Sequence, residues 1–157
     1  MPPDRPPPER FDQPPPEPLA SAIGFLLSWN GQRTAHEFAR ALEPLDLRPP
    51  HFGVMTLIEA HPGSTQNELV TGSLIDPSSM VAVIDELEEL GLAERRRHPS
   101  DRRKHAVHLT TKGKRRLARA QEAATTMIER LLEPLDQGER ETLRVLLRKL
   151  ARVHKPG

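Results

Sequence analysis

The sequence predicts a single domain that is mainly α-helical and carries one small β-hairpin. Apolar residues recur at steps of three and four residues over most of the chain, which is typical of amphipathic helices. Residues 92–110 interrupt this period with two short extended runs joined by a turn-rich tip, which is the pattern of a hairpin. The 157 residues, 36% of them hydrophobic, correspond to one domain of ordinary size with one core.

Residues 1–17 are predicted to be a disordered, proline-rich tail. Nine of the first 18 residues are proline, and charged residues lie between them. Such a composition buries little apolar surface and favours polyproline II or a disordered chain. An unstructured leader is the favoured interpretation and a recognition peptide is the alternative. The folded domain is then expected to span residues 18–157.

Two helices are expected next. The helical period that begins at Pro18 ends at Pro44, which indicates a first helix of about 25 residues. Pro49 and Pro50 suit the start of a second helix, because proline is tolerated in the first helical turn. The run 61–63, His-Pro-Gly, ends this second helix.

A third and a fourth helix follow, joined by a tight turn. Thr65 and Glu68 form the pattern of a capping box, so a short helix begins there and ends near Gly72. The pair Asp76-Pro77 is typical of an N-cap and a first-turn proline, and Gly91 is expected to end this fourth helix. Its inward-facing side chains are expected to be Met80, Val81, Ile84, Leu87 and Leu90. The two helices match the helix-turn-helix outline.

A hairpin wing and two more helices complete the pattern. Residues 92–97 and 105–110 suit extended strands, and residues 98–101 form the tip between them. Thr110 or Thr111 caps a long helix, and residues 136–139 form a capping-box-like start of a last helix. The predicted fold is therefore a winged helix-turn-helix domain with further helices at its N- and C-terminal ends.

Positive charge is concentrated on the predicted wing. Residues 92–116 contain ten Lys and Arg and two acids, a net charge of +8, whereas the rest of the chain carries −7. Such a concentration of charge on a hairpin directly after a helix-turn-helix is expected of a phosphate-binding face. Double-stranded DNA is therefore the expected partner, and a merely solvated basic surface is the alternative.

Composition excludes several classes of protein. The chain has no cysteine, which rules out disulfides, thiolate zinc sites and cysteine catalysis. No glycine-rich phosphate loop, nucleophile elbow or zinc-protease motif occurs, so we expect no enzyme, no catalytic residue and no cofactor. His98, His105 and His108 lie near the wing without a compact carboxylate cluster, so no metal site is expected. Without a long apolar run, a cytoplasmic protein with no membrane contact is predicted.

The segment around the wing resembles the winged-helix core of the MarR family, the multiple-antibiotic-resistance regulators. The resemblance rests on residues 91–96 (Gly-Leu-Ala-Glu-Arg-Arg), 101–103 (Asp-Arg-Arg) and 109–113 (Leu-Thr-Thr-Lys-Gly). It extends over roughly residues 19–153, because the order of helices before and after the wing also matches. The resemblance implies a homodimeric transcription factor, more often a repressor than an activator, that binds a pseudo-palindromic operator.

The resemblance also implies a division of the chain into dimerisation and DNA-binding parts. Residues 18–48 and 112–157 correspond to dimerisation helices, and residues 49–111 correspond to the winged helix-turn-helix. The wide apolar faces of the terminal helices independently favour pairing with a second copy, because one small domain cannot bury them all.

In the family, the fourth helix enters the major groove and the wing tip reaches the minor groove. Asp101, two residues before Arg103, matches the family's aspartate and arginine at the tip. Arginine suits a narrow minor groove, and a neighbouring carboxylate can hold its guanidinium in position. The residues expected to contact DNA are Ser64, Thr65, Gln66, Ser78, Ser79, Met80, Ala82, Arg95, Arg97, Asp101, Arg102, Arg103, Lys104 and Lys112.

The predicted recognition helix departs from the family in its chemistry. Residues 77–90 contain four acids and no Lys or Arg, and Val81-Ala82 stands where members of the family commonly have polar pairs. Arginine-to-guanine readout is therefore missing, and specificity should depend on the wing and on DNA shape. The alternative function is a protein-interaction module or anti-regulator on the same fold, with weak DNA specificity.

A candidate effector site lies on the first helix. Trp29, Arg33 and His36 fall at i, i+4 and i+7, so an aromatic ring, a guanidinium and an imidazole share one face. Such a face can stack on, and pair with, a small aromatic or phenolic effector. With side chains from the second helix, the candidate set is Trp29, Arg33, His36, His51, Phe52 and Met55. The other interpretation is that these residues pack in the core or in a dimer interface, and this interpretation is favoured over an effector site.

Overall fold

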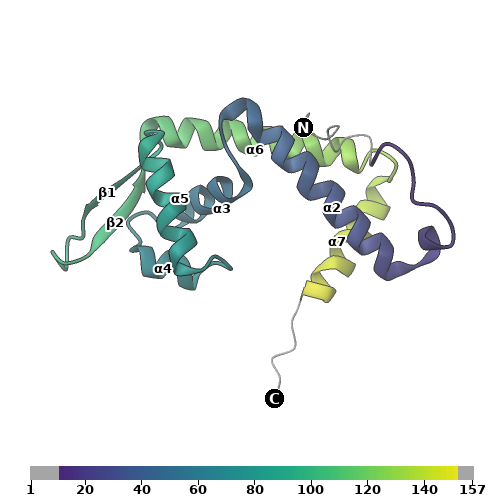
Figure 1. Ribbon diagram of the computed structural model, residues 1–157, viewed down its shortest axis with the longest axis horizontal. Coiled ribbons are helices and arrows are strands. Elements are labelled where there is room, and N and C mark those ends of the chain that lie inside the picture. The colour runs from purple at the N-terminus through teal and green to yellow at the C-terminus, as the bar shows by residue number, and fades with distance from the viewer. Residues whose placement is uncertain (1–10, 152–157) are drawn as a thin grey trace, which may run out of the picture.

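The computed structural model describes residues 11–151, which form an elongated molecule (Figure 1). In chain order its elements are η1 (Leu19–Ser21), α2 (Ile23–Leu42), η2 (Glu43–Leu45), α3 (Pro49–Ala60), α4 (Gln66–Thr71), α5 (Pro77–Glu89), β1 (Ala93–Arg97), β2 (His105–Leu109), α6 (Thr111–Leu131) and α7 (Gln137–Ala151). Helices α3, α4 and α5 gather with the hairpin at one end, α2 and α7 lie at the other, and α6 connects the two (Figure 1). The predicted fold class, mainly α with a small β-hairpin wing, is confirmed.

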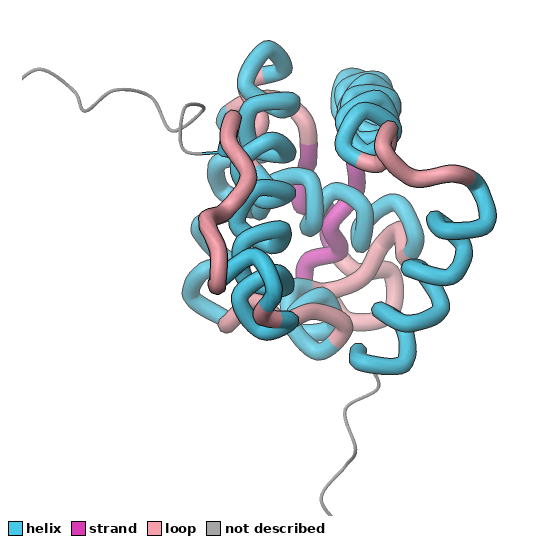
Figure 2. The backbone as a smooth tube through the Cα atoms, turned by 90° about the vertical axis from the view of Figure 1, so that its right-hand side faces the viewer, coloured by secondary structure: helices cyan, strands magenta, loops and turns pink. Residues whose placement is uncertain are grey.

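The wing is a two-stranded antiparallel hairpin that is tied to the helix-turn-helix. Strand β1 pairs with β2, and Ala93 lies opposite Leu109 at the base of the hairpin. Figure 2 shows the two strands in magenta. Thr65, directly before α4, forms an isolated antiparallel bridge with Ala106. The start of α4 and the wing are therefore held together by backbone hydrogen bonds as well as by the core.

Helix α5 packs one apolar face into the core of this winged domain. Met80, Val83, Ile84 and Leu87 are all buried, and their spacing of i, i+3, i+4 and i+7 places them on one side of the helix. Val81 falls outside this stripe and is 38% exposed, so the prediction that it faces inward is wrong.

Two glycines allow the close packing around the wing base. Gly91 has a φ of 70°, in the left-handed region that residues with a Cβ rarely adopt, and it follows Leu90, the C-cap of α5. The N–H of Leu92 then donates to the carbonyl of Leu87 at 2.8 Å. A Cβ on Gly113 would lie 1.9 Å from the carbonyl oxygen of Leu92. Glycine at 113 therefore lets α6 begin in direct contact with the backbone before β1.

The terminal helices leave a large apolar surface uncovered. Helix α2 packs along α6, whereas α7 buries none of its residues in the single chain. Arg140 holds the corner between α6 and α7 by pairing with Glu129 at 2.6 Å and donating to the Leu132 carbonyl at 2.9 Å. Large apolar side chains that stay exposed at this end of the molecule are Leu19, Ile23, Leu27, Val145, Leu146, Leu147 and Leu150.

The N-terminal region differs from its prediction in two respects. The first helix is divided, because the short η1 precedes an α2 of 20 residues. The expected tail ended at residue 17, but Phe11 already contacts α2 through the ring of Trp29. The remainder of the expected tail, residues 1–10, lies outside the described residues, as do residues 152–157 of the expected dimerisation segment. Within residues 11–151, no helix combines the length and the apolar character needed to cross a bilayer.

Candidate nucleic-acid interface and effector face

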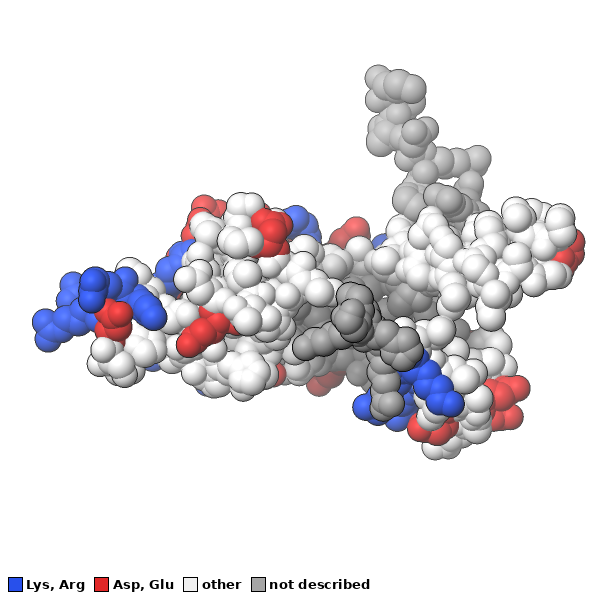
Figure 3. All heavy atoms as spheres, turned by 90° about the horizontal axis from the view of Figure 1, so that it is seen from below, with Lys and Arg blue, Asp and Glu red and all other residues white. Residues whose placement is uncertain are grey.

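The wing tip presents cationic side chains to solvent. The side chain of Arg103 is 95% exposed, and its Nε lies 3.7 Å from Oδ1 of Asp101. The same carboxylate oxygen accepts a hydrogen bond from the backbone N–H of Arg103 at 3.0 Å. Arg97, Arg102 and Lys104 are exposed on the same hairpin, and Figure 3 shows Lys and Arg gathered at this end of the molecule. Asp101 thus shapes the turn and stands beside the guanidinium, which is free to enter a narrow groove.

Arg95, an expected phosphate contact, is engaged inside the protein. Its side chain is only 22% exposed, and it pairs with Glu88 and, at 2.7 Å, with Asp85, both on α5. It also donates to the side-chain oxygen of Gln66 at 3.2 Å. Arg95 therefore connects β1, α4 and α5, and its charge is largely neutralised by these two acids.

Lys112, another expected phosphate contact, is bound to the end of α5. Its Nζ donates to the carbonyl of Leu90 at 2.8 Å, and Thr110 donates to the carbonyl of Gly91 at 2.7 Å. The last carbonyls of a helix lack partners within the helix and favour a positive charge. Lys112 therefore stabilises the C-terminal end of α5 in this structure.

The N-terminal end of α4 is capped by a carboxylate of its own. The hydroxyl of Thr65 accepts from the N–H of Glu68 at 3.3 Å, and the Glu68 carboxylate accepts from the N–H of Thr65 at 2.7 Å. These bonds to Thr65 lower the pKa of Glu68. Ser64 donates to the carbonyl of His61 at 2.9 Å. The Glu68 carboxylate already accepts the hydrogen bond of the Thr65 N–H. A DNA phosphate at this end of α4 would therefore be bound by the other hydrogen-bond donors of Ser64, Thr65 and Gln66.

The N-terminal end of α5 is organised around Asp76. Its carboxylate accepts from the N–H of Ser79 at 3.0 Å and from the hydroxyls of Ser78 and Ser79, each at 2.6 Å. These hydrogen bonds hold the pKa of Asp76 well below its usual range. Ser78 and Ser79 are exposed, as base-contacting residues must be. Their hydroxyl protons are directed to Asp76, so they would meet a base as acceptors.

Two apolar residues of α5, Met80 and Val81, differ from their predicted roles. Met80 is fully buried and has no access to a base, which corrects its predicted role as a DNA contact. Ala82 is exposed, and so is its neighbour Val81. Leu74, in the turn before α5, is fully exposed. The outward surface at this end of the helix therefore carries methyl groups, the chemistry that contacts a thymine methyl.

Most of the acids on α5 have partners within the protein. The carboxylate of Glu86 is bound by the Arg48 guanidinium and lies 2.6 Å from Nε2 of His51. His51 and then Arg48 are the main groups that lower the pKa of Glu86. Asp85 and Glu88 bind Arg95, as described above. Three of the four acids are therefore paired with side chains of the protein, which reduces the repulsion that this helix exerts on phosphates.

The candidate effector residues form two separate groups. Trp29, Arg33 and His36 are half-buried along α2. The ring of Phe11 lies 5.2 Å from the ring of Trp29 and 5.9 Å from that of His36, centroid to centroid. Phe25 also stacks on Trp29, with its ring 5.9 Å from that of Trp29. The α2 group is therefore an aromatic surface that a segment of the chain itself already contacts.

The second group belongs to the core of the winged domain. Met55 is fully buried, and Phe52 packs edge-on against Phe38 at 5.1 Å. His51 is 4% exposed, and its Nδ1 accepts from the backbone N–H of Arg48 at 3.0 Å. Met55 and His51 are thus committed to packing and hydrogen bonding, and the structure corrects their assignment to the wall of an open cleft.

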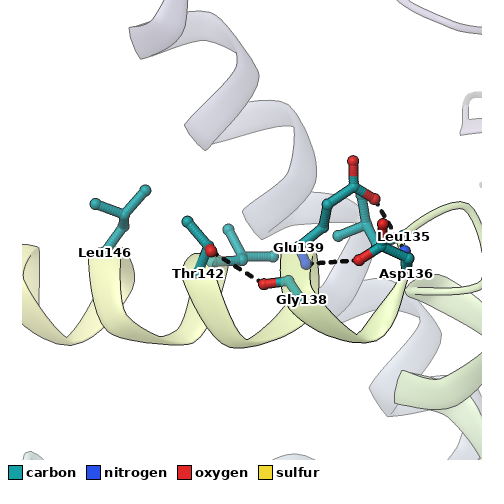
Figure 4. A pocket seen from close by; sticks show the side chains of 7 residues that line it. Leu135, Asp136, Gly138, Glu139, Thr142 and Leu146 are labelled. Carbon is teal, nitrogen blue, oxygen red and sulfur yellow. Dashed lines mark hydrogen bonds between the residues drawn. The ribbon is translucent and has the colours of Figure 1, made fainter.

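A hollow of about 550 Å³ opens elsewhere, at the start of α7 (Figure 4). Asp136 and Glu139 form a reciprocal capping box at its edge, with both hydrogen bonds at 2.9 Å. The other lining residues are Leu135, Gly138, Thr142, Leu143 and Leu146. None of the candidate effector residues lines this hollow, which belongs to the uncovered surface of α7.

Acid is expected to destabilise the helix-turn-helix through Asp76. Because its pKa is lowered in the folded state, its ionised form adds stability above the ordinary value of 3.8, and this is lost as the pH falls through the folded-state pKa. We expect the thermal midpoint, followed by circular dichroism, to fall below about pH 4. Asp76→Asn, which retains a capping side chain, should show a smaller fall. The same pH profile for both proteins would contradict this role of Asp76.

A helix-turn-helix followed by a hairpin with a basic, exposed tip defines a winged helix-turn-helix DNA-binding protein. A model described as the MarR family matches residues 45–104. A protein from Thauera aromatica, described as a putative transcriptional regulatory protein for the hcr operon, is 33% identical over 135 residues, which are 85% of this chain and 81% of the relative. The chain belongs to the MarR family, and it is a transcriptional regulator rather than an enzyme.

Two solved structures show the similarity in three dimensions. The transcriptional repressor CouR bound to a 23-mer DNA duplex has a TM-score of 0.77 and 38% identity, over 85% of this chain and 95% of that one. CouR from Rhodococcus jostii RHA1 bound to p-coumaroyl-CoA has a TM-score of 0.73 and 30% identity, over 90% of this chain and all of that one. The family resemblance inferred from residues 91–113 is thereby confirmed.

Proposed function

We propose that this chain is a homodimeric repressor that binds a pseudo-palindromic operator and leaves it when a small aromatic effector binds. The exposed Arg103 beside Asp101, at the tip of the basic wing, is the observation that carries the proposal. In a dimer, two such wings enter the minor grooves that flank half-sites about 34 Å apart.

The operator is read mainly by the wing and by DNA shape. Helix α5 has no Lys or Arg, so it lacks the bidentate contacts to guanine that give strong base selection. We assign minor-groove contact to Arg103, with Arg102 beside it, and phosphate contacts to Arg97 and Lys104, all of them exposed. The base contacts proposed for α5 are Ser78, Ser79, Val81 and Ala82.

Dimerisation explains the apolar surface at the α2 and α7 end. Soluble monomers seldom expose large contiguous apolar patches, and an isologous contact between two copies covers the same patch on both. Helix α7 supplies Leu146 and Leu150, which are 50% and 68% exposed. Ile23, at the start of α2, is 79% exposed. The hollow in Figure 4 lies on the same uncovered side of α7, where a partner helix would fill it.

Introducing charge on α7 should therefore produce a monomer. We expect Leu146→Asp together with Leu150→Asp to sediment as a monomer in analytical ultracentrifugation, because burying two carboxylates in an apolar interface is unfavourable. Operator affinity should fall roughly 100-fold, since one half-site contact no longer assists the other. Leu74→Asp, on an exposed leucine of the winged domain, is the matched control for the oligomeric state and should remain dimeric. A double variant that stays dimeric would remove α7 from the interface.

The proposed effector is a planar aromatic acid or its CoA thioester. The α2 residues Trp29, Arg33 and His36 combine a stacking surface with a cation and an imidazole, which suits an aromatic ring that bears an anionic or carbonyl group. The CouR structure bound to p-coumaroyl-CoA makes an aromatic thioester a specific candidate. To release DNA, the effector must bind more tightly to the dimer geometry that does not fit the operator.

Binding to DNA from the region upstream of its own coding sequence tests the regulator directly. The purified protein is titrated against this duplex by fluorescence anisotropy, with excess random duplex present, at about 50 and 200 mM salt. We expect selective binding that weakens at least about 100-fold across this range, which corresponds to about four neutralised phosphates. Adding p-coumaroyl-CoA or p-coumarate then tests release.

The alternative, a protein-interaction module on the same fold, predicts a different result. The acidic side chains of α5 favour this alternative, because they would repel DNA phosphates. However, three of the four acids are paired with side chains of the protein. Contacts made through apolar helices depend little on salt, whereas phosphate contacts depend on it steeply. Failure to bind any duplex of a genomic library above random competitor at low salt would overturn the DNA-binding proposal in favour of this alternative.

A further inference from the structure

The N-terminal segment places an aromatic side chain on the candidate effector face of α2. Phe11 meets Trp29 edge-on, at an interplanar angle of 70°, and lies tilted by 31° over the imidazole of His36. Phe25 also stacks on Trp29, at an interplanar angle of 27°. The chain has four Phe, one Trp and no Tyr, so three of its five such aromatic residues meet at this one place.

One ring nitrogen of His36, close to Phe11, lacks a hydrogen-bond partner. Nε2 of His36 is buried, and it makes no hydrogen bond within residues 11–151. The phenyl ring of Phe11, with its centroid 5.9 Å from that of the imidazole, supplies neither a donor nor an acceptor, and a buried polar group without a partner is unfavourable. Arg33, one helical turn from Trp29, forms no ion pair with a carboxylate of residues 11–151. A polar group that entered with a second aromatic ring would satisfy both side chains.

We infer that Phe11 is a built-in occupant of the effector face, and that a planar aromatic carboxylate or thioester displaces it. The incoming ring takes the position of Phe11 against Trp29, and its polar group supplies the hydrogen bond that Nε2 of His36 lacks. Arg33 pairs with the carboxylate or with the carbonyl oxygen of the thioester. This inference rests on the proposed effector response and names the segment of the chain that competes with the effector.

The segment around Phe11 is suited to such an exchange. Residues 12–14 and 16–18 are exposed, and only Phe11 and Pro15 are half-buried before η1 begins. In Figure 1 this segment, coloured purple, turns back from the start of α2. Displacing it therefore exposes little apolar surface besides one phenyl ring. An effector can bind only the molecules in which Phe11 has left this face. The apparent effector affinity is therefore the intrinsic affinity multiplied by the fraction of such molecules.

Removal of the phenyl ring should tighten effector binding. The probes are p-coumarate and p-coumaroyl-CoA, and the signal is the fluorescence of Trp29, the only tryptophan in the chain. We expect Phe11→Ala to bind the responsive probe about tenfold more tightly than the wild type, because the competing occupant is gone. Gln13→Ala, an exposed position of the same segment, is the matched control and should bind like the wild type. Effector-free DNA binding should be the same in all three proteins.

Displacement can be observed directly at a single label. The chain has no cysteine, so Gln13→Cys gives one attachment site for bimane, a fluorophore that nearby tryptophan quenches. We expect the bimane signal to rise when the probe binds, as residues 11–13 leave Trp29. Cyclohexanecarboxylate, which has the charge but not the aromatic ring, should leave the signal unchanged. His36→Ala should weaken probe binding while the segment remains in place.

Three results would overturn the inference. If Phe11→Ala binds the probes no more tightly than the wild type does, Phe11 does not compete with the effector. Its ring would then pack against α2 or form part of the effector site. An unchanged bimane signal at saturating probe would show that the segment stays in place. Failure of both probes to bind even Phe11→Ala would exclude this ligand class on this face. Selective DNA binding by the same samples separates these results from the proposed regulator function. If it persists, the regulator proposal stands whichever of the three results is found, and if it is lost, only the regulator proposal is contradicted.

Discussion

Arg103→Ala is expected to weaken operator binding by about 1–3 kcal/mol, roughly 5- to 150-fold, without changing the stability of the protein. The side chain is 95% exposed, so its removal leaves no cavity and no unpaired buried group. Its loss removes the charge that meets the enhanced negative potential of a narrow minor groove. The measurement is fluorescence anisotropy on the operator, with circular dichroism melts in parallel.

Two further wing variants separate minor-groove contact from general attraction to phosphates. Arg103→Lys keeps the charge but not the planar guanidinium, so it should recover only part of the affinity if the groove is being read. Arg96→Ala is the matched control, because Arg96 lies on the same wing but already pairs with Glu94. We expect a smaller loss for Arg96→Ala than for Arg103→Ala. Equal losses would indicate that the wing acts only as a diffuse positive charge.

Gly113→Ala is expected to lower the free energy of unfolding by about 3 kcal/mol, at the upper end of what overpacking costs. A Cβ at this position would lie 1.9 Å from the carbonyl oxygen of Leu92, and that carbonyl is backbone, which cannot turn aside as a flexible side chain can. To relieve the clash, the start of α6 must move away from the wing. Urea unfolding followed by circular dichroism measures the change.

A second glycine provides the control for Gly113. Gly53 lies within α3, and a Cβ there meets nothing within 4 Å. Gly53→Ala should therefore be neutral or stabilising by up to about 1 kcal/mol, because alanine favours the helix and restricts the unfolded chain. Similar effects of the two substitutions would show that helix propensity, rather than the contact with Leu92, decides the outcome at 113.

Much of the fold could be predicted from local signals. The start of α4 follows from the reciprocal bonds that Thr65 and Glu68 can make, and the start of α5 from Asp76 followed by a proline. The inward stripe of α5 was also within reach of spacing arguments. Val81 stands one residue after Met80 and outside the i, i+3, i+4, i+7 set, so its outward position could have been found from the sequence.

The partners of the charged side chains were beyond such arguments. Arg95 was expected to contact phosphate, and it instead binds acids that precede it in the chain by seven and ten residues. His51 was expected to face an effector, and it instead holds Glu86, 35 residues away. Charge patterns along a sequence show how many cations a segment has, but a pairing between elements exists only after those elements have packed.

Local sequence signals were enough to predict the helix-turn-helix, the hairpin, the two C-terminal helices and the basic wing with its Asp101 and Arg103. These follow from local physics: helix period, capping, turn geometry and the position of charge. Only the tertiary structure shows that three acids of α5 are paired within the protein and that the ring of Phe11 lies against that of Trp29. Those contacts join residues far apart in the chain, and the chain must fold before their geometry exists.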